Sequence, residues 1–414
     1  MYSFQLTDEQ QEIREAVREF VNKEVKPVAL KPARLEASER YLPEALFRQA
    51  SQLGLRTLAL PEALGGAGAD MLTSCIVAEE LAAGDVDFAM TLMTTSHLSR
   101  VLFDRAMSAE QRARFLPPFI ANDACHLACA EMESAYVADG GANYHRPYAA
   151  AAGTKLAAAR QNNGDWVVNG TTDYVANAAV AALVAIEVRT GAESGDGIST
   201  LLVARDTPGV GLRKPEPGAD GNPLYVWHHG AGGELEFSDC KVPAANLLGT
   251  AGTRALAGSR ASISHDNPLL QAMNLGVGRA AYEAALDYAR LRVQGGRPII
   301  EHQAMGALLA EIAIKLEVAR NMVWKAAWAA DHPEACTDRD TADLPLQGIA
   351  RVFTSDAVHQ VALRAAEVFG ATGVMRDMPL QKYVHDALVF VHAGAGNTVE
   401  TLKIAEAVAG YRRS

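Results

Sequence analysis

The sequence predicts an α+β protein in which a helical region, a β region and a second helical region follow one another. Apolar residues recur at helical spacing up to about residue 123 and again beyond about residue 264. Between them, short apolar runs alternate with glycine, asparagine and aspartate, which is typical of strands joined by turns. We therefore expect an N-terminal helical domain (1–125), a middle β domain (126–249) and a C-terminal helical bundle (250–414).

The composition is that of an acidic globular protein. The chain has 414 residues, with 49 Asp and Glu against 38 Lys and Arg, which gives a net charge of −11. This charge argues against a nucleic-acid partner, and an anionic ligand would need a local basic pocket. The five cysteines lack the spacing of a disulfide framework, and the first ten residues lack the features of a signal peptide. Cysteines without a disulfide framework favour a reducing compartment, so we expect a cytoplasmic protein. The longest apolar run is too short to cross a membrane, so we expect no membrane association.

The N-terminal domain is predicted to begin with a capped helix. Thr7 and Gln10 form a capping-box pattern directly before an apolar periodic run. A second helical pattern covers 42–53, a glycine-rich turn follows at 61–68, and helical segments continue to about residue 117.

Short apolar runs predict the strands of a small antiparallel sheet in the middle domain. They cover 164–170, 183–188, 198–203 and 233–237. The last run alternates polar and apolar residues, as a strand with one buried face does.

A long amphipathic helix is predicted within 264–303. Gly276 and Gly278 interrupt its apolar pattern, which indicates that another backbone or a ligand approaches closely there. A Gly-Gly pair at 295–296 is predicted to end the helix, and a new helical run starts near residue 301.

Three stretches resemble motifs of the acyl-CoA dehydrogenase family of flavoproteins. The segment from Gly276 to Gln303 is similar to G-x-x-x-x-A-x-x-Y-A-x-x-R-x-x-F-G-x-P-I-x-x-x-Q, with Gly295 in place of the phenylalanine. The turn at 61–68 resembles P-x-x-x-G-G-x-G, and 242–249 resembles V-P-x-x-N-x-L-G. The resemblance covers nearly the whole chain.

The resemblance implies a helical domain, a β domain and a four-helix bundle that also builds a homotetramer or dimer. It implies that FAD binds between the β domain and the bundle, with its pyrophosphate held by the neighbouring subunit. It further implies an acyl-CoA thioester as substrate and an electron-transferring flavoprotein as onward acceptor.

The family's reaction needs a carboxylate that removes the proton α to the thioester. In the C-terminal motif R-D-x-x-x-x-x-I-Y-E-G-T, the glutamate position is occupied here by Gly394 or Ala395, which are candidate substrate-binding residues. Members of the isovaleryl type carry the base ten residues before the glycine that matches Gly276, and that position is Asp266. Asp266 is the predicted catalytic base. The alternative is a helix cap, because Asp-Asn-Pro is also a good helix start.

The resemblance also supplies the candidate cofactor contacts, several of which depart from the family's residues. They are Glu131, Tyr174, Ala176, Arg292, Gln303, Glu367, Gly370 and Asn397. Tyr174 stands where the family has a tryptophan against the flavin ring, and Ala176 where it has a threonine. Glu367 replaces the glutamine that meets the pyrophosphate, which is unfavourable unless a cation intervenes. Arg292 and Gln303 are alternatively surface residues at helix ends.

Met93 and Thr94 resemble in position the floor of the family's acyl pocket. Their side chains would suit a compact or polar acyl group. Ordinary helix packing explains them about as well.

Two other groups of residues offer possible metal ligands. Cys125, His126 and Cys129 lie close together, but on a strand they point to alternating faces, so we expect no metal site. His228 and His229 lie in a glycine-rich stretch and are expected to form a solvated loop pair.

The sequence thus favours an acyl-CoA dehydrogenase-like flavoenzyme, with Asp266 as base and FAD as hydride acceptor. The altered flavin motifs favour an alternative, a non-catalytic or half-site subunit in a hetero-oligomer with an intact homologue. A third hypothesis keeps acyl-CoA and flavin but assigns a non-oxidative elimination.

Overall fold

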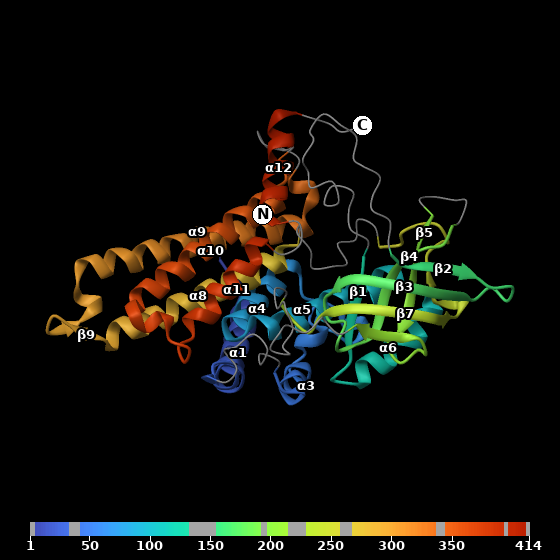
Figure 1. Ribbon diagram of the computed structural model, residues 1–414, viewed down its shortest axis with the longest axis horizontal. Helices are drawn as coiled ribbons and strands as arrows, with labels where there is room; N and C mark the ends of the chain where they lie inside the picture. The colour runs from blue at the N-terminus through green and yellow to red at the C-terminus, as the bar shows by residue number, and fades with distance from the viewer. Residues whose placement is uncertain are drawn as a thin grey trace, which may run out of the picture.

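The computed structural model describes residues 5–32, 42–131, 155–191, 197–213, 229–256, 267–336, 344–392 and 396–410. The β domain lies at one end of the molecule and the long C-terminal helices at the other, with the first helices between them (Figure 1). The predicted α+β class and the order of helical, β and helical regions are confirmed.

The N-terminal region is helical up to Ala121. Thr7 caps the first helix as predicted, because its side chain accepts from the Gln10 amide while the Gln10 side chain accepts from the Thr7 amide. The elements are α1 (Asp8–Phe20), η1 (Val21–Val25), α2 (Lys26–Ala29), α3 (Glu44–Gln52), η4 (Leu55–Thr57), η5 (Glu62–Leu64), α4 (Met71–Gly84), α5 (Val86–Ser99), η6 (Arg100–Ala106) and α6 (Ala109–Ala121).

The middle region forms a sheet whose strand order is β6-β7-β3-β2-β4-β5-β8, with β1 also paired to β4. The elements are β1 (His126–Ala130), β2 (Ala157–Arg160), β3 (Trp166–Val175), β4 (Ala181–Arg189), β5 (Ile198–Ala204), β6 (Val210–Arg213), β7 (Gly233–Val242), η7 (Ala244–Asn246) and β8 (Leu247–Leu248).

The prediction of an antiparallel sheet is wrong at its centre. Strands β1 and β2 both pair with β4 in parallel, whereas the other pairs are antiparallel. A parallel pair needs a long connection instead of a hairpin, and the long stretch of chain between β1 and β4 supplies it. Apolar alternation shows which face of a strand is buried but not the direction of its partner.

The C-terminal region contains the predicted long helix and the helices that pack on it. The elements are α8 (Pro268–Leu291), β9 (Val293–Gln294), β10 (Arg297–Pro298), η8 (Ile299–Glu301), α9 (Gln303–Asp331), η9 (Pro333–Cys336), α10 (Leu346–Phe369), η10 (Gly370–Val374), α11 (Leu380–His392) and α12 (Gly396–Ala409).

Helix α8 ends earlier than the Gly-Gly pair that was predicted to stop it. Its C-cap is Arg292, and the glycines instead form the two-residue turn of the β9–β10 hairpin. Gly295 and Gly296 have φ values of 58° and 80°, which a two-residue hairpin turn of the primed type requires.

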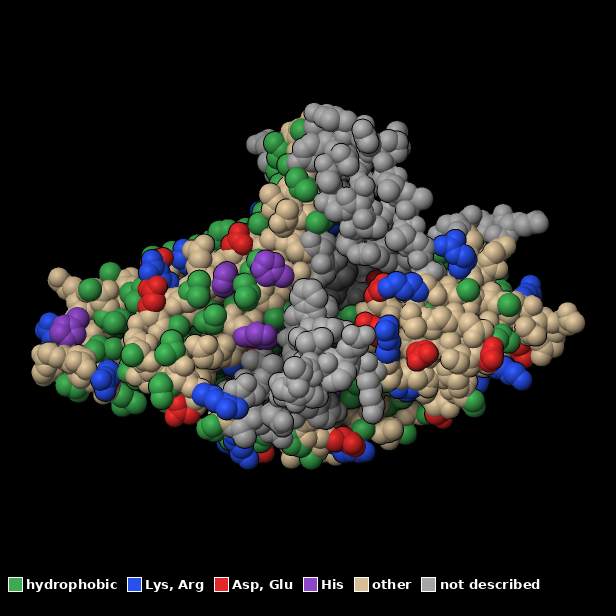
Figure 2. Space-filling view, in the orientation of Figure 1, with side chains coloured by type: hydrophobic (Ala, Val, Ile, Leu, Met, Phe, Trp, Pro, Cys, Tyr) green, Lys and Arg blue, Asp and Glu red, His purple; other side chains and the backbone are tan. Residues whose placement is uncertain are grey.

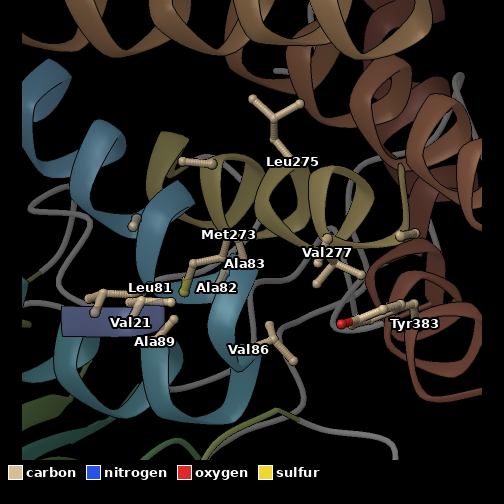
Figure 3. Packing of buried hydrophobic residues seen from close by; sticks show 14 of the residues in the cluster. Val21, Leu81, Ala82, Ala83, Val86, Ala89, Met273, Leu275, Val277 and Tyr383 are labelled. Carbon is tan, nitrogen blue, oxygen red and sulfur yellow. The ribbon is translucent and has the colours of Figure 1, made fainter. Parts of the chain in front are cut away.

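Helices α4 and α8 pack closely, as the glycines of α8 predict. A Cβ on Gly276 would overlap the Glu79 carbonyl oxygen and lie 2.8 Å from the Ala82 Cβ. Figure 3 shows Met273 directed towards Ala82 and Ala83 at this crossing. The expectation of a close backbone approach at Gly276 is confirmed.

The buried hydrophobic residues form three clusters that decide how the domains meet. One cluster joins the N-terminal helices to the C-terminal bundle, a second lies inside the sheet, and a third fills the junction of α5, η6 and α6 with the sheet. The two helical regions therefore share one core, on which the sheet is held through α5 and its neighbours. Within the described ranges, no helix is both long and apolar enough to cross a membrane.

Candidate functional site

Buried polar side chains fasten the end of the sheet to α5. Asn177 follows β3 with a φ of 64° and is fully buried. Its side-chain amide donates to the Thr91 carbonyl, the Thr95 hydroxyl and the Leu127 carbonyl at 2.9, 3.2 and 3.2 Å. The His126 Nδ1 lies 3.0 Å from the same Thr95 hydroxyl. The ends of β1 and β3, where candidate flavin contacts were predicted, are thereby fixed against one face of α5.

Tyr174 and Ala176 lie at this fixed edge and are both half-buried. The Tyr174 hydroxyl donates to the His229 carbonyl at 3.2 Å and lies against the backbone of Gly232. Burial, and secondarily the charge of Asp87, raises the pKa of Tyr174 well above its ordinary value. The phenol is therefore a neutral donor that holds its ring at the end of β3.

His229 is buried, so the prediction of a solvated histidine pair is wrong for this residue. Its Nδ1 lies 3.4 Å from Asp87 Oδ1, and its Nε2 donates to the Asp386 carbonyl at 3.1 Å. Its ring also packs on Phe390, with ring centroids 4.7 Å apart. The partners that replace water come from α5 and α11, which are distant in sequence, so the local sequence could not reveal them. His228 lies outside the described residues.

A buried ion cluster lies next to His229 and ties α11 to the start of α5. Lys382 Nζ donates to Asp386 Oδ2 at 2.6 Å and lies 3.3 Å from Asp85 Oδ2. All three side chains are at most 2% exposed. Asp85 also caps α5 by accepting from the Phe88 amide. Breaking such a buried pair leaves an uncompensated charge, so the cluster fixes α11, the helix that leads towards positions 394 and 395.

A cavity of about 270 Å³ lies where α5, the start of α4, the start of α8 and the end of α9 meet. Met93, which was predicted to lie in the acyl pocket, contributes to its wall. Asn267 also lines it and is the N-cap of α8, since its side-chain oxygen accepts from the Leu269 amide. The Asn267 amide nitrogen lies 3.3 Å from His97 Nε2.

Thr94 is only 3% exposed, and its hydroxyl has no hydrogen-bond partner among the described residues. Buried hydroxyls are nearly always hydrogen-bonded in folded proteins, and the partner of this one is not among the described residues. Glu131 lies at the end of β1 and is half-buried.

The other candidate cofactor residues lie at the opposite end of the bundle. Arg292, Gln303, Glu367 and Gly370 are all exposed. The Tyr288 ring stacks on Phe369 with centroids 4.1 Å apart, so the ends of α8 and α10 meet there. Helix α8 has 24 residues and therefore separates this end from Asn267 by roughly 36 Å. One copy of the chain does not bring the two groups together (Figure 1).

Asn397 belongs to neither group. Its amide donates to Asp356 Oδ1 at 2.8 Å, on the middle of α10. Its side-chain oxygen has no hydrogen-bond partner in the part of the chain that the structure describes.

Comparison with known families decides the classification. Family models for the N-terminal, middle and C-terminal domains of acyl-CoA dehydrogenases match residues 7–123, 148–239 and 257–409, in that order. The chain belongs to the acyl-CoA dehydrogenase family. The three matches agree with the observed helical, β and helical regions.

Individual family members are similar over nearly their whole length. An acyl-CoA dehydrogenase of Bacillus subtilis is 29% identical over 410 residues, covering 98% of this chain and 99% of that protein. The probable acyl-CoA dehydrogenase FadE25 of Mycobacterium tuberculosis is 29% identical over 391 residues, with 93% and 92% covered. The structure of butyryl-CoA dehydrogenase from Megasphaera elsdenii matches with a TM-score of 0.79 at 25% identity, covering 99% of this chain and all of that one.

The candidate catalytic and thioester positions of this family member are not described by the structure. Asp266, Gly394 and Ala395 lie outside the described residues, so their roles stay predictions. The N-cap of α8 among the described residues is Asn267.

The sequence did not predict the ion cluster or the polar residues of the cavity. Lys382 and Asp386 are spaced i, i+4, which is a signal for a helical ion pair, but the spacing does not show that the pair is buried. Arg100 and Arg105 follow the apolar helix α5 and line the cavity. Two arginines directly after an apolar helix were the only feature of the sequence that indicated this polar wall.

Proposed function

We propose that this protein is an FAD-dependent acyl-CoA dehydrogenase that oxidises the α,β carbon–carbon bond of a CoA thioester. The proposal is supported by the family membership and by the similarity to enzymes named for this activity. The observation that carries it within the structure is the position of Asn267. This residue lines the cavity together with Met93, and Asp266 directly precedes it in sequence.

Asp266 is the group that removes the proton α to the thioester carbonyl in this proposal. The neighbouring cavity then receives the acyl group, with Met93 and Leu269 supplying apolar contacts.

The residues at the junction of the sheet and α5 fit a flavin ring. Tyr174 presents an aromatic side chain whose hydroxyl is already fixed by the His229 carbonyl. Thr94, on α5, presents a buried hydroxyl without a partner among the described residues. Bound FAD would supply the acceptor for the hydride that leaves the β carbon.

A second copy of the chain completes the cofactor site in this proposal. Arg292 and Gln303, at the far end of one bundle, would reach the pyrophosphate of the FAD bound to the neighbouring copy. The Glu367 carboxylate by itself would repel a pyrophosphate. Arg364 Nη1 lies 2.7 Å from this carboxylate, and in this proposal its positive charge offsets the repulsion.

The surface of the C-terminal bundle is consistent with such an assembly. Hydrophobic side chains are spread over the bundle face seen in Figure 2. Several large ones are exposed by 40% or more, namely Ile314, Val318, Phe353, Leu363, Val374 and Met375. Exposed apolar residues concentrated on one domain mark a protein contact, and we propose a homotetramer built as a dimer of dimers.

The electrons leave the reduced flavin for an electron-transferring flavoprotein in this proposal. We place the reaction in the cytoplasm, because Cys75, Cys125, Cys129 and Cys240 are all free and buried.

The test is the anaerobic reduction of the bound flavin by short acyl-CoA thioesters. We expect the visible flavin absorbance of the wild-type protein to bleach on mixing. Asp266→Asn, which keeps the side-chain size, should retain the flavin but bleach roughly a hundredfold to ten-thousandfold more slowly, because the proton acceptor is lost. Arg48→Leu, at an exposed ion pair on α3, serves as the control and should bleach at the wild-type rate.

Two results contradict the proposal and point to the alternatives. A protein that stays colourless in the presence of added FAD supports the non-catalytic subunit. A flavin-bound protein that converts acyl-CoA without bleaching supports the elimination reaction.

A further inference from the structure

The cavity beside α8 has a polar lining, which is unexpected for a pocket that would take a simple alkyl chain. Besides Met93 and Leu269, its wall includes Ser74, Arg100 and Arg105. Ligand pockets are mostly apolar, and their few polar groups fix the orientation of a matching polar ligand. The polar lining therefore indicates that the part of the substrate bound here carries a polar group.

Two arginines of this wall form no ion pair with a carboxylate of the described residues. Neither Arg100 nor Arg105 makes an ion pair with another residue in the described ranges. Arg100 donates one weak hydrogen bond, from Nη1 to the Ala69 carbonyl at 3.3 Å, and its buried Nε has no partner among these residues. An unpaired guanidinium in a partly enclosed site costs free energy unless an anion binds to it.

The carboxylates near this wall bind to helix ends instead of the arginines. Asp331 lines the cavity, and its Oδ2 accepts from the Met71 amide at 2.6 Å. Asp70 accepts from the Thr73 amide at 2.7 Å as the N-cap of α4. Both acids accept these bonds from the first turn of α4, and neither forms an ion pair with Arg100 or Arg105 in the described ranges. Burial raises the pKa of Asp331, and the nearby charge of Arg100 partly opposes this rise. The wall thus carries two arginines against one carboxylate, which leaves positive charge for a ligand.

We propose that the acyl group of the substrate ends in a carboxylate and that this cavity receives it, with Arg100 as the principal contact. The inference rests on the proposed function. A planar guanidinium binds a carboxylate with two parallel hydrogen bonds, which fixes both the length and the direction of the chain that carries it. In a protein with a net charge of −11, this cavity is the local basic pocket that an anionic ligand needs.

The size and place of the cavity favour the acyl end of the substrate over the phosphates of CoA. Its volume of about 270 Å³ is below that of pockets that enclose a drug-sized ligand, so it accommodates only part of an acyl-CoA. Asn267 on its wall directly follows the predicted base, and the carbon atoms that react must lie near that base.

The experiment compares thioesters of equal length that end in a methyl or a carboxylate group, hexanoyl-CoA and adipoyl-CoA, on the flavin-bound protein. We expect the wild type to have the higher kcat/KM for adipoyl-CoA. Arg100→Leu should lower kcat/KM for adipoyl-CoA by roughly tenfold to a hundredfold, the range of one charge-assisted hydrogen bond, while leaving hexanoyl-CoA unchanged or improved. Arg105→Leu, at the exposed rim, should lower it less.

The control and the binding measurements separate the possible failures. Arg48→Leu should not alter the ratio of the two kcat/KM values. If Arg100→Leu does not fold, two other variants test the ratio of kcat/KM for adipoyl-CoA to that for hexanoyl-CoA. Arg105→Leu removes one positive charge of the wall, whereas Arg100→Lys keeps the charge but removes the planar guanidinium. Equal ratios in the wild type and these variants overturn the inference and leave the proposed function intact.

Calorimetric binding distinguishes the remaining outcomes. Arg100→Leu could raise the dissociation constants of free CoA and of both thioesters by the same factor. That result would assign the cavity to the phosphates of CoA and overturn the inference. If no thioester reduces the flavin, the proposed function fails. The inference then stands only if adipoyl-CoA still binds more tightly than hexanoyl-CoA and Arg100→Leu abolishes the difference.

Discussion

His126 shows how a single buried residue supports the junction between the sheet and α5. It is 3% exposed, and its Nδ1 donates to the Thr95 hydroxyl, which in turn donates to the Thr91 carbonyl. Burial, together with the charge of Arg56, lowers the pKa of His126 from 6.5 to about 4. The ring is therefore neutral in the folded protein at neutral pH.

This shift predicts a loss of stability in mild acid. Because the folded pKa is below the unfolded one, the unfolded chain binds a proton first as the pH falls. The stabilisation is present above about pH 6.5 and is lost progressively down to about pH 4. Between pH 7.5 and pH 5, wild type should lose about 2 kcal/mol more free energy of unfolding than His126→Gln. Urea unfolding at both pH values measures this, and equal losses would show that the histidine is not held neutral.

The same residue shows the limit of prediction from sequence at this scale. The sequence placed His126 on a strand and named Tyr174 as a candidate flavin contact. The partners Thr95 and His229 were not predicted, because they lie 31 and 55 residues away in the chain. Residue types and local spacing identify candidates, whereas burial and hydrogen bonding depend on segments that meet only in the fold.

At the scale of elements, the crossing of α4 and α8 determines how the two helical regions meet. Gly276 allows the backbones to touch, and Arg279 then binds Glu80 across the same contact, with Nη2 2.7 Å from Oε2. Arg18 of α1 binds the same carboxylate at 2.6 Å. The start of α8, which carries Asn267, is thereby positioned beside α5.

Gly276→Ala should destabilise the protein by about 2 kcal/mol or more, because the added methyl overlaps the α4 backbone and outweighs the helix propensity of alanine. Gly306→Ala on α9 is the matched control. Nothing lies within 4 Å of the added methyl there, so stability should rise by up to about 1 kcal/mol. Scanning calorimetry of both variants measures the effect. Midpoints that shift equally would show that the close approach does not exist.

The elements that the sequence predicted well are those with a strong local signal. The capping box of α1, the glycines of α8 and the alternation of β7 each specify their own structure. The β9–β10 hairpin and the parallel pairing of β1 with β4 were missed. A Gly-Gly pair ends a helix or turns a hairpin with the same φ values, and strand direction depends on connections outside the strand.

At the scale of the whole molecule, the candidate cofactor residues fall into two groups that one chain keeps apart. Tyr174, Ala176 and Glu131 lie where the sheet meets α5, whereas Arg292 and Gln303 lie beyond the far end of α8. The sequence identified both groups by resemblance but gave no distance between them. In our proposal, this separation makes FAD binding depend on assembly, with each copy contributing one group to its neighbour's site.

The most direct measurement is therefore the flavin content of the purified protein, determined with its mass in solution. The visible absorption spectrum and the released flavin give the number of flavins per chain, and light scattering coupled to gel filtration gives the oligomer. Our account predicts one FAD per chain in a homo-oligomer, and acyl-CoA should bleach the bound flavin. A homo-oligomer that stays colourless with added FAD, or a monomer that binds FAD fully, would contradict it.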